Sequence, residues 1–135
     1  MIFLLSLKRE EGVKMEAHDP RPWVYQVLNS VKPRVKLVTT VGFKVDKKRE
    51  KRFLELVNGF VVENRRAPGV IHFDLHSLLP PSEDRGEYLL YEEFEDRDCV
   101  KGHWESDSLP IFQGKLQGEE LITSLPDLRF YARSL

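Results

Sequence analysis

The 135-residue sequence contains a single cysteine, Cys99, and no long apolar run. One cysteine excludes an intrachain disulfide framework and a cysteine-rich zinc site. No stretch approaches the ~20 apolar residues that a membrane-spanning helix needs. The apolar start, Met1–Leu7, is at the lower limit for a secretory signal and lacks both the positive start and the cleavage site, although the sequence leaves open whether it is a targeting remnant. We therefore expect a cytoplasmic protein with no membrane partner.

The sequence also lacks an excess of one charge, since 21 basic and 22 acidic residues give a net charge of −1. The two signs are nevertheless separated along the chain. Residues 1–66 hold 15 basic and 8 acidic residues, whereas residues 67–135 hold 6 and 14. A nucleic-acid-binding protein is expected to keep an uncompensated basic face. We expect the two halves to neutralise each other, within a subunit or across a dimer, and predict no nucleic-acid partner.

The remaining composition, 41% hydrophobic and 32% charged, is typical of a soluble globular chain. Its length suits one domain with a single core. Residues 1–34 are predicted to be a partly flexible N-terminal extension, because His18–Pro22 has turn chemistry and only Trp23–Leu28 offers a patch that can dock. Residues 35–135 are predicted to form the folded domain.

Apolar periodicity predicts four strands and two helical regions in that domain. β-branched residues and alternation predict strands over residues 35–45, 70–79, 87–95 and 126–131. Recurrence at three and four residues predicts helices over 47–66 and 97–105, the second continuing over 108–118; Asp46 and Ser108 are the expected caps. The order β-α-β-β-α-β predicts an α+β, ferredoxin-like split βαβ fold, with an antiparallel sheet and both helices on one face.

Three motifs together resemble the antibiotic biosynthesis monooxygenase (ABM) domain family over about residues 35–131. Asn64–Phe73 (NRRAPGVIHF) is similar to the family's arginine, glutamate, proline, glycine turn followed by an aromatic residue. Tyr91–Asp96 (YEEFED) is similar to its glutamate-x-tryptophan strand end with an acidic cap. His103–Ser106 (HWES) is placed nine residues beyond Phe94, where the family has histidine-x-x-serine. Each motif alone is weak, but their order and spacing are specific.

The resemblance implies a homodimer in which two sheets face each other as a dimeric α+β barrel, with a cavity between each sheet and its helices. It also implies oxygenation of a small aromatic or quinol-like substrate by dioxygen, without metal, flavin or haem cofactors. The substrate, once deprotonated, donates an electron to dioxygen.

Three departures from the family pattern leave other functions open. Ala67 replaces an acidic residue, Phe94 stands where tryptophan is common, and Ser108-Leu109 replaces a histidine-phenylalanine pair. A non-oxidative isomerase of a small carbonyl compound and a non-catalytic ligand-binding or stress-associated barrel remain as alternatives. Haem degradation is disfavoured, because Thr39, Thr40 and Phe94 replace the asparagine and tryptophan of haem-degrading relatives.

The predicted catalytic residues are His103 and Glu92. A histidine whose pKa is near neutral suits proton removal from a phenol. Glu92 shares a strand face with Leu90 and Phe94, so its carboxylate is expected to be desolvated and to orient His103 or to act as its acid/base partner. The alternatives are a structural histidine bonded to a backbone carbonyl and a salt bridge of Glu92 with Arg65 or Arg66.

Six further residues are predicted to bind substrate, with core packing as the alternative for the aromatic ones: Phe60, Arg65, Tyr91, Phe94, Trp104 and Ser106. His72, Asp74 and His76 share a strand face and suggest a metal site, but no fourth ligand is evident and a solvated face is favoured, so no metal is predicted. Cys99 is expected to be a small buried group; a thiolate–imidazole pair with His103 is the alternative.

Overall fold

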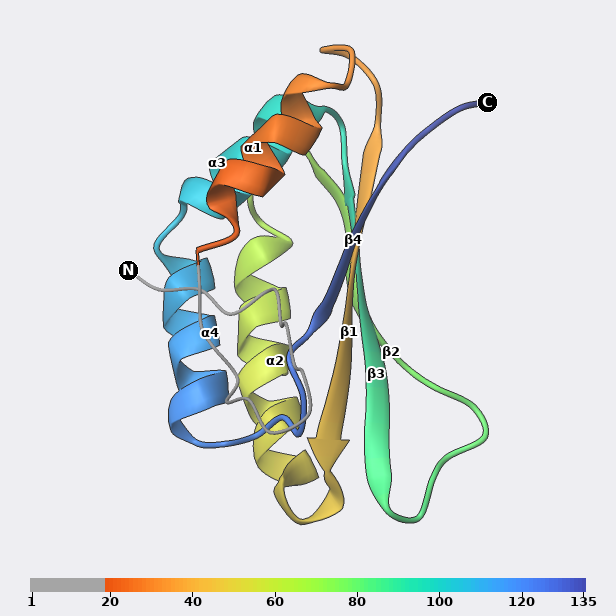
Figure 1. Ribbon diagram of the computed structural model, residues 1–135, viewed down its shortest axis with the longest axis vertical. Coiled ribbons are helices and arrows are strands. Elements are labelled where there is room, and N and C mark those ends of the chain that lie inside the picture. The colour runs from red at the N-terminus through yellow and green to blue at the C-terminus, as the bar shows by residue number, and fades with distance from the viewer. Residues whose placement is uncertain (1–18) are drawn as a thin grey trace, which may run out of the picture.

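The computed structural model describes residues 19–135, in which four strands form one antiparallel sheet in the order β2-β3-β1-β4 (Figure 1). The strands are β1 (Leu37–Asp46), β2 (Val70–Ser77), β3 (Arg85–Phe94) and β4 (Asp127–Ala132). The predicted α+β ferredoxin-like topology is confirmed. Met1–Leu7, the segment considered as a possible targeting remnant, lies outside the described residues.

Four helices lie on one face of this sheet (Figure 1). They are α1 (Arg21–Asn29), α2 (Glu50–Asn64), α3 (Arg97–Glu105) and α4 (Ser108–Gly118). Asp46 accepts a hydrogen bond from the Lys48 amide at 3.0 Å, as a cap does, but it starts a 3-10 turn over Lys47–Arg49 before α2 begins. No helix within residues 19–135 is long and apolar enough to cross a membrane.

Helix α1 belongs to the segment predicted as an extension, and it is packed onto the domain. It lies beside α3 at one end of the helical layer, with Val24 and Leu28 buried (Figure 1). The Arg97 side chain of α3 donates a hydrogen bond to the carbonyl of Val31, just beyond α1. The apolar side chains of α1 therefore bury in the same core as those of the domain.

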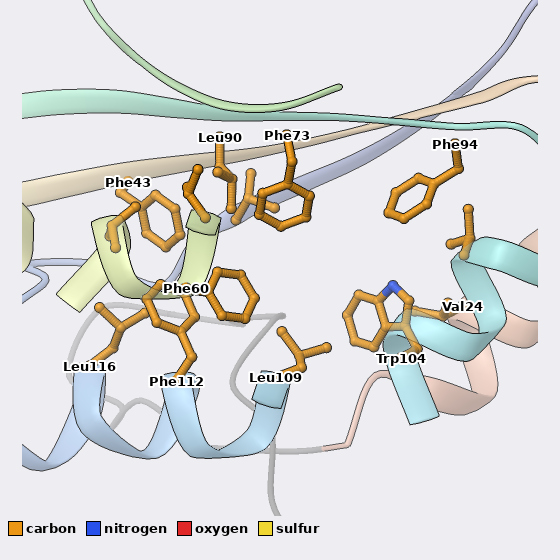
Figure 2. Close-up of a cluster of buried hydrophobic side chains, with 14 of the residues drawn as sticks. Val24, Phe43, Phe60, Phe73, Leu90, Phe94, Trp104, Leu109, Phe112 and Leu116 are labelled. Carbon is orange, nitrogen blue, oxygen red and sulfur yellow. The ribbon is translucent and has the colours of Figure 1, made fainter. Parts of the chain in front are cut away.

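The core lies between the sheet and the helices. Figure 2 shows Phe43 and Leu90 reaching from the sheet toward Phe60 of α2 and Phe112 of α4. The rings of Phe60 and Phe112 stack with their centroids 4.1 Å apart. Strand alternation produces this arrangement, because every second side chain of a strand faces the helices. We call the face of the sheet that packs against the helices the covered face, and the opposite face the open face.

Ion pairs join the basic half of the chain to the acidic half. Arg52, at the start of α2, donates to Glu119, just after α4, at 2.6 Å, and Arg49 lies 3.8 Å from Glu120. The predicted compensation of charge thus takes place, at these positions, within one chain.

Candidate active site

The connection between β3 and α3 places a carboxylate and an imidazole together. After β3 ends at Phe94, the Asp96 carboxylate accepts a hydrogen bond from the Cys99 amide at 3.0 Å and caps α3. That amide also holds the pKa of Asp96 below its usual value. Helix α3 buries His103 and Trp104, so its inner side meets the covered face of β3, where Glu92 lies.

His103 and Glu92 form a pair in an apolar environment. The Nε2 atom of His103 lies 3.6 Å from Oε1 of Glu92, and the two side chains are only 5% and 4% exposed. The imidazole is surrounded by the rings of Phe60, Phe73 and Phe94, with centroids 5.9, 5.6 and 5.7 Å away. Three phenylalanine rings replace water around the imidazole, so the protein interior solvates a charge on it poorly.

Burial shifts the two pKa values in opposite directions. Desolvation raises the pKa of Glu92 to about 8 and lowers the pKa of His103 to about 4, because each group loses the water that stabilises its charged form. At pH 7 the pair therefore consists of a carboxylic acid and a neutral imidazole. The neutral ring accepts a proton at one nitrogen and donates at the other.

Asn64, at the end of α2, determines which nitrogen of His103 carries the proton. Its Oδ1 lies 3.1 Å from Nδ1 of His103, and its Nδ2 donates to the Phe60 carbonyl at 2.8 Å. The carbonyl only accepts hydrogen bonds, so it fixes the amide with Oδ1 toward the ring. Nδ1 of the neutral imidazole must then carry the hydrogen. The unprotonated Nε2 is left on the side of Glu92.

A narrow cavity of about 20 Å³, with room for about one water molecule, lies between the sheet and the helices beside this pair. Its lining is mostly apolar and includes residues of β1, β3, α2, α3, α4 and β4: Thr39, Val41, Phe43, Phe60, Leu90, Glu92, His103, Trp104, Leu109, Phe112, Gln113, Leu116, Pro126 and Leu128. Figure 2 shows Leu109, Phe112 and Leu116 of α4 reaching toward the sheet across the core. A ligand larger than water must displace some of these side chains.

The structure brings four of the predicted residues to the cavity: Phe60, Glu92, His103 and Trp104. Phe94 packs against the His103 ring without lining the cavity. Its place in β3, two residues beyond Glu92, makes it part of the apolar surroundings of the imidazole.

Three predicted substrate-binding residues lie elsewhere. Arg65 donates to the Phe73 carbonyl at 2.9 Å and pairs with Asp74, so the alternative ion pair of Glu92 with Arg65 is not formed. Tyr91 alternates with Glu92 and lies on the open face, with its ring beside that of His76.

Ser106, the third of these residues, follows α3 at its C-terminal end. Its hydroxyl donates to the His103 carbonyl at 2.7 Å, which ties down the end of the helix, and it does not line the cavity.

Three polar residues of the site were not among the predicted ones. Thr39 lies directly opposite Glu92 in the β1–β3 register and is buried. Gln113 of α4 lines the cavity and is also buried, and Asn64 holds His103. A signal was present for Gln113, which is one polar residue within the apolar stripe of Leu109, Phe112 and Leu116.

The open-face residues His72, Asp74 and His76 do not form a metal site. Within residues 19–135 no group of three or more His, Cys, Asp or Glu side chains is arranged to hold a metal ion. His72 instead lies 3.5 Å from Glu93.

Cys99 is partly buried, and its side chain packs against Gly69 at the place that a Cβ would occupy, so this position, with a φ of +80°, suits only glycine. Burial raises the pKa of the Cys99 thiol, which disfavours the thiolate needed for a pair with His103.

Comparison with known proteins identifies the family. The family model described as antibiotic biosynthesis monooxygenase matches residues 37–113, which span β1 to α4 and include Glu92 and His103. The chain belongs to the ABM family. The resemblance found in its three motifs is confirmed. No curated protein matches the chain.

Solved structures share the ABM fold at low sequence identity. A Nitrosomonas europaea protein provisionally named as an antibiotic biosynthesis monooxygenase has a TM-score of 0.64 and 18% identity, covering 76% of this chain and 93% of its own. A conserved protein from Methanosarcina mazei Go1 has a TM-score of 0.66 and 17% identity, covering 75% and 95%. PA3566 from Pseudomonas aeruginosa has a TM-score of 0.63 and 15% identity, covering 78% and 100%. These similarities establish the fold of the ABM domain.

Proposed function

We propose that this ABM protein is a cofactor-independent monooxygenase of a phenolic or quinol-type substrate, in which His103 and Glu92 together remove the substrate proton. The observation that carries the proposal is the buried His103–Glu92 pair beside a largely apolar cavity. A dry cavity suits a reaction with dioxygen, because it excludes water from reactive intermediates.

The pair is a better base than either residue alone. With Glu92 protonated, a substrate proton must go to an imidazole whose pKa is about 4, whereas a phenol has a pKa near 10. Glu92 loses its proton with a pKa of about 8. The deprotonated pair then accepts the substrate proton at Nε2 of His103, and the Glu92 carboxylate stabilises the imidazolium that forms. The active form is therefore the deprotonated pair, and activity rises with pH toward about 8.

The deprotonated ring then transfers one electron to dioxygen. The ring radical and superoxide combine to form a carbon–oxygen bond, and loss of water breaks the oxygen–oxygen bond. One oxygen atom stays on the ring as a carbonyl and the other leaves in water. The quinol supplies every electron, so the scheme requires no separate reductant. The protein positions the ring and removes the proton.

We further propose that the protein is a cytoplasmic homodimer, in which the open faces of the two sheets pack together. Support comes from exposed apolar side chains on that face, such as Leu89 and Tyr131, which a second sheet would bury. The cytoplasmic location is consistent with the single free cysteine.

Oxygen consumption with 1,4-naphthohydroquinone tests the function. We expect the wild-type protein to raise the initial rate above autoxidation, and His103→Gln to lower the enzymatic rate at least about 100-fold, the usual effect of losing a general base. His72→Gln, on the open face, is the matched control. Equal enzymatic rates for wild type and His103→Gln contradict the role of His103. Turnover of a carbonyl substrate without oxygen identifies an isomerase instead.

A further inference from the structure

Three buried polar atoms, each on a residue that lines the cavity, have no hydrogen-bond partner within residues 19–135. They are Thr39 Oγ1 of β1, Trp104 Nε1 of α3 and Gln113 Oε1 of α4. The three residues are each more than nine-tenths buried, with relative exposures of 1%, 4% and 6%. All three line the cavity that contains the His103–Glu92 pair.

Unpaired polar atoms in a protein interior destabilise the folded state, and native proteins satisfy nearly all of them. Here three gather around one cavity whose other lining residues are mostly apolar. Their unused hydrogen-bonding capacity is available to a ligand in this cavity. A single water molecule, which is all that the cavity holds as it stands, can serve them only in part.

The chemistry of the three atoms defines the ligand. The indole N–H of Trp104 only donates, the Oε1 atom of Gln113 only accepts, and the hydroxyl of Thr39 does either. A matching ligand presents a hydrogen-bond acceptor to Trp104 and a donor to Gln113. The stacked rings of Phe60 and Phe112, which line the same cavity, favour a planar body.

We propose that Thr39, Trp104 and Gln113 select an aromatic compound that carries a hydroxyl group and, at a separate position, a hydrogen-bond acceptor such as a carbonyl or a second hydroxyl oxygen. The proposal names the substrate class of the site proposed above and rests on that function only for the location of the ligand. It requires no turnover and is tested by binding alone.

Three small probes of similar shape separate the required groups. 4-Hydroxyacetophenone carries a hydroxyl and a carbonyl, acetophenone only the carbonyl, and 4-ethylphenol only the hydroxyl. Calorimetry on the full chain should show the first binding at least about tenfold more tightly than either of the others. Equal affinities, or no binding of any probe, overturn the proposal.

Isosteric variants show which residues provide the selectivity. Thr39→Val, Trp104→Phe and Gln113→Met should each reduce the preference for 4-hydroxyacetophenone at least about fivefold. The urea midpoint of the ligand-free protein should stay unchanged or rise for Thr39→Val and Gln113→Met, because an unpaired buried polar group is removed. Each variant has a matched control outside the cavity: Thr40→Val, Trp23→Phe and Gln117→Met.

Binding selectivity and the urea midpoint together distinguish a role in ligand recognition from a role in folding. Lower urea midpoints with unchanged selectivity would show that the polar atoms serve folding, which overturns the proposal. Selective binding that depends on these residues, without oxygen consumption for any quinol, supports this proposal and contradicts the monooxygenase function. If the wild-type protein consumes oxygen with a quinol and the three variants do so at the same rate, the monooxygenase function is supported and the present proposal is contradicted.

Discussion

Two neighbouring glutamates of β3 each meet a histidine, one on each face of the sheet. On the covered face, Glu92 lies 3.6 Å from His103, and the side chains are 4% and 5% exposed. On the open face, Glu93 lies 3.5 Å from His72, and the side chains are 24% and 59% exposed. The residue types and distances are nearly the same. The two pairs differ in their access to water.

That difference shows why a histidine–carboxylate distance is not evidence for a base. Water solvates the exposed pair, and such pairs contribute little to stability. The covered pair lacks this solvation, so burial alone moves the pKa of Glu92 upward and that of His103 downward. The burial that destabilises the ionised groups also gives the pair a pKa suited to a phenol.

The largest expected effect comes from removing the buried carboxyl group. Between pH 4.5 and about 8 the folded protein keeps a proton on Glu92 that the unfolded chain releases, so stability falls as the pH rises through this window. Each pKa unit corresponds to about 1.4 kcal/mol. Glu92→Gln cannot ionise, and we expect it to be more stable than wild type by a few kcal/mol at pH 8 in urea unfolding.

The same variant should behave like wild type at low pH and lose activity at high pH. As the pH falls from 6.5 to about 4, the unfolded chain gains a proton on its histidine that buried His103 does not take up, so Glu92→Gln loses stability there. In wild type the proton that Glu92 keeps in the folded state offsets this loss down to about pH 4.5. Oxygen consumption by Glu92→Gln should no longer rise toward pH 8. The control is Glu93→Gln on the open face. If Glu92→Gln and wild type lose stability equally between pH 6.5 and 8, the desolvation argument fails.

The next largest effect concerns the residue that orients the buried histidine. Asn64→Ala leaves the buried Nδ1–H of His103 without a partner, at a cost of about 1–3 kcal/mol, whereas the Phe60 carbonyl keeps its helical hydrogen bond within α2. Asn58→Ala, at an exposed position of the same helix, should change stability by less than about 0.5 kcal/mol.

A second measurement on Asn64→Ala separates orientation from stability. In nitrogen NMR spectra, wild-type His103 should show Nδ1 protonated and Nε2 unprotonated, whereas the variant should show a mixture of tautomers. A single unchanged tautomer in the variant contradicts the positioning role of Asn64.

The fold was predictable from sequence because local patterns determine it. Alternation in β3 correctly placed Glu92 with Leu90 and Phe94, and the acidic cap Asp96 correctly started the helix that carries His103. These features depend on neighbours a few residues apart.

The polar part of the site was less predictable, since it depends on contacts between distant segments. Asn64 and His103 are 39 residues apart, and Thr39 and Glu92 meet only through the β1–β3 register. Tyr91 alternates with Glu92 along β3, so the strand period alone places Tyr91 on the face opposite the site.

The smallest expected effect lies on the open face, where a solvent-exposed ion pair can be compared with the buried His103–Glu92 pair. Asp74 pairs with Arg65, and the two side chains are exposed enough for water and salt to screen them. We expect Asp74→Asn to lower stability by less than about 1 kcal/mol in low salt and by nothing measurable in 1 M salt. Binding of 4-hydroxyacetophenone should not change, because Arg65 still donates to the Phe73 carbonyl and lies outside the cavity. A loss of affinity in this variant would show that Arg65 contributes to substrate binding, and would contradict the conclusion that only the covered face forms the site.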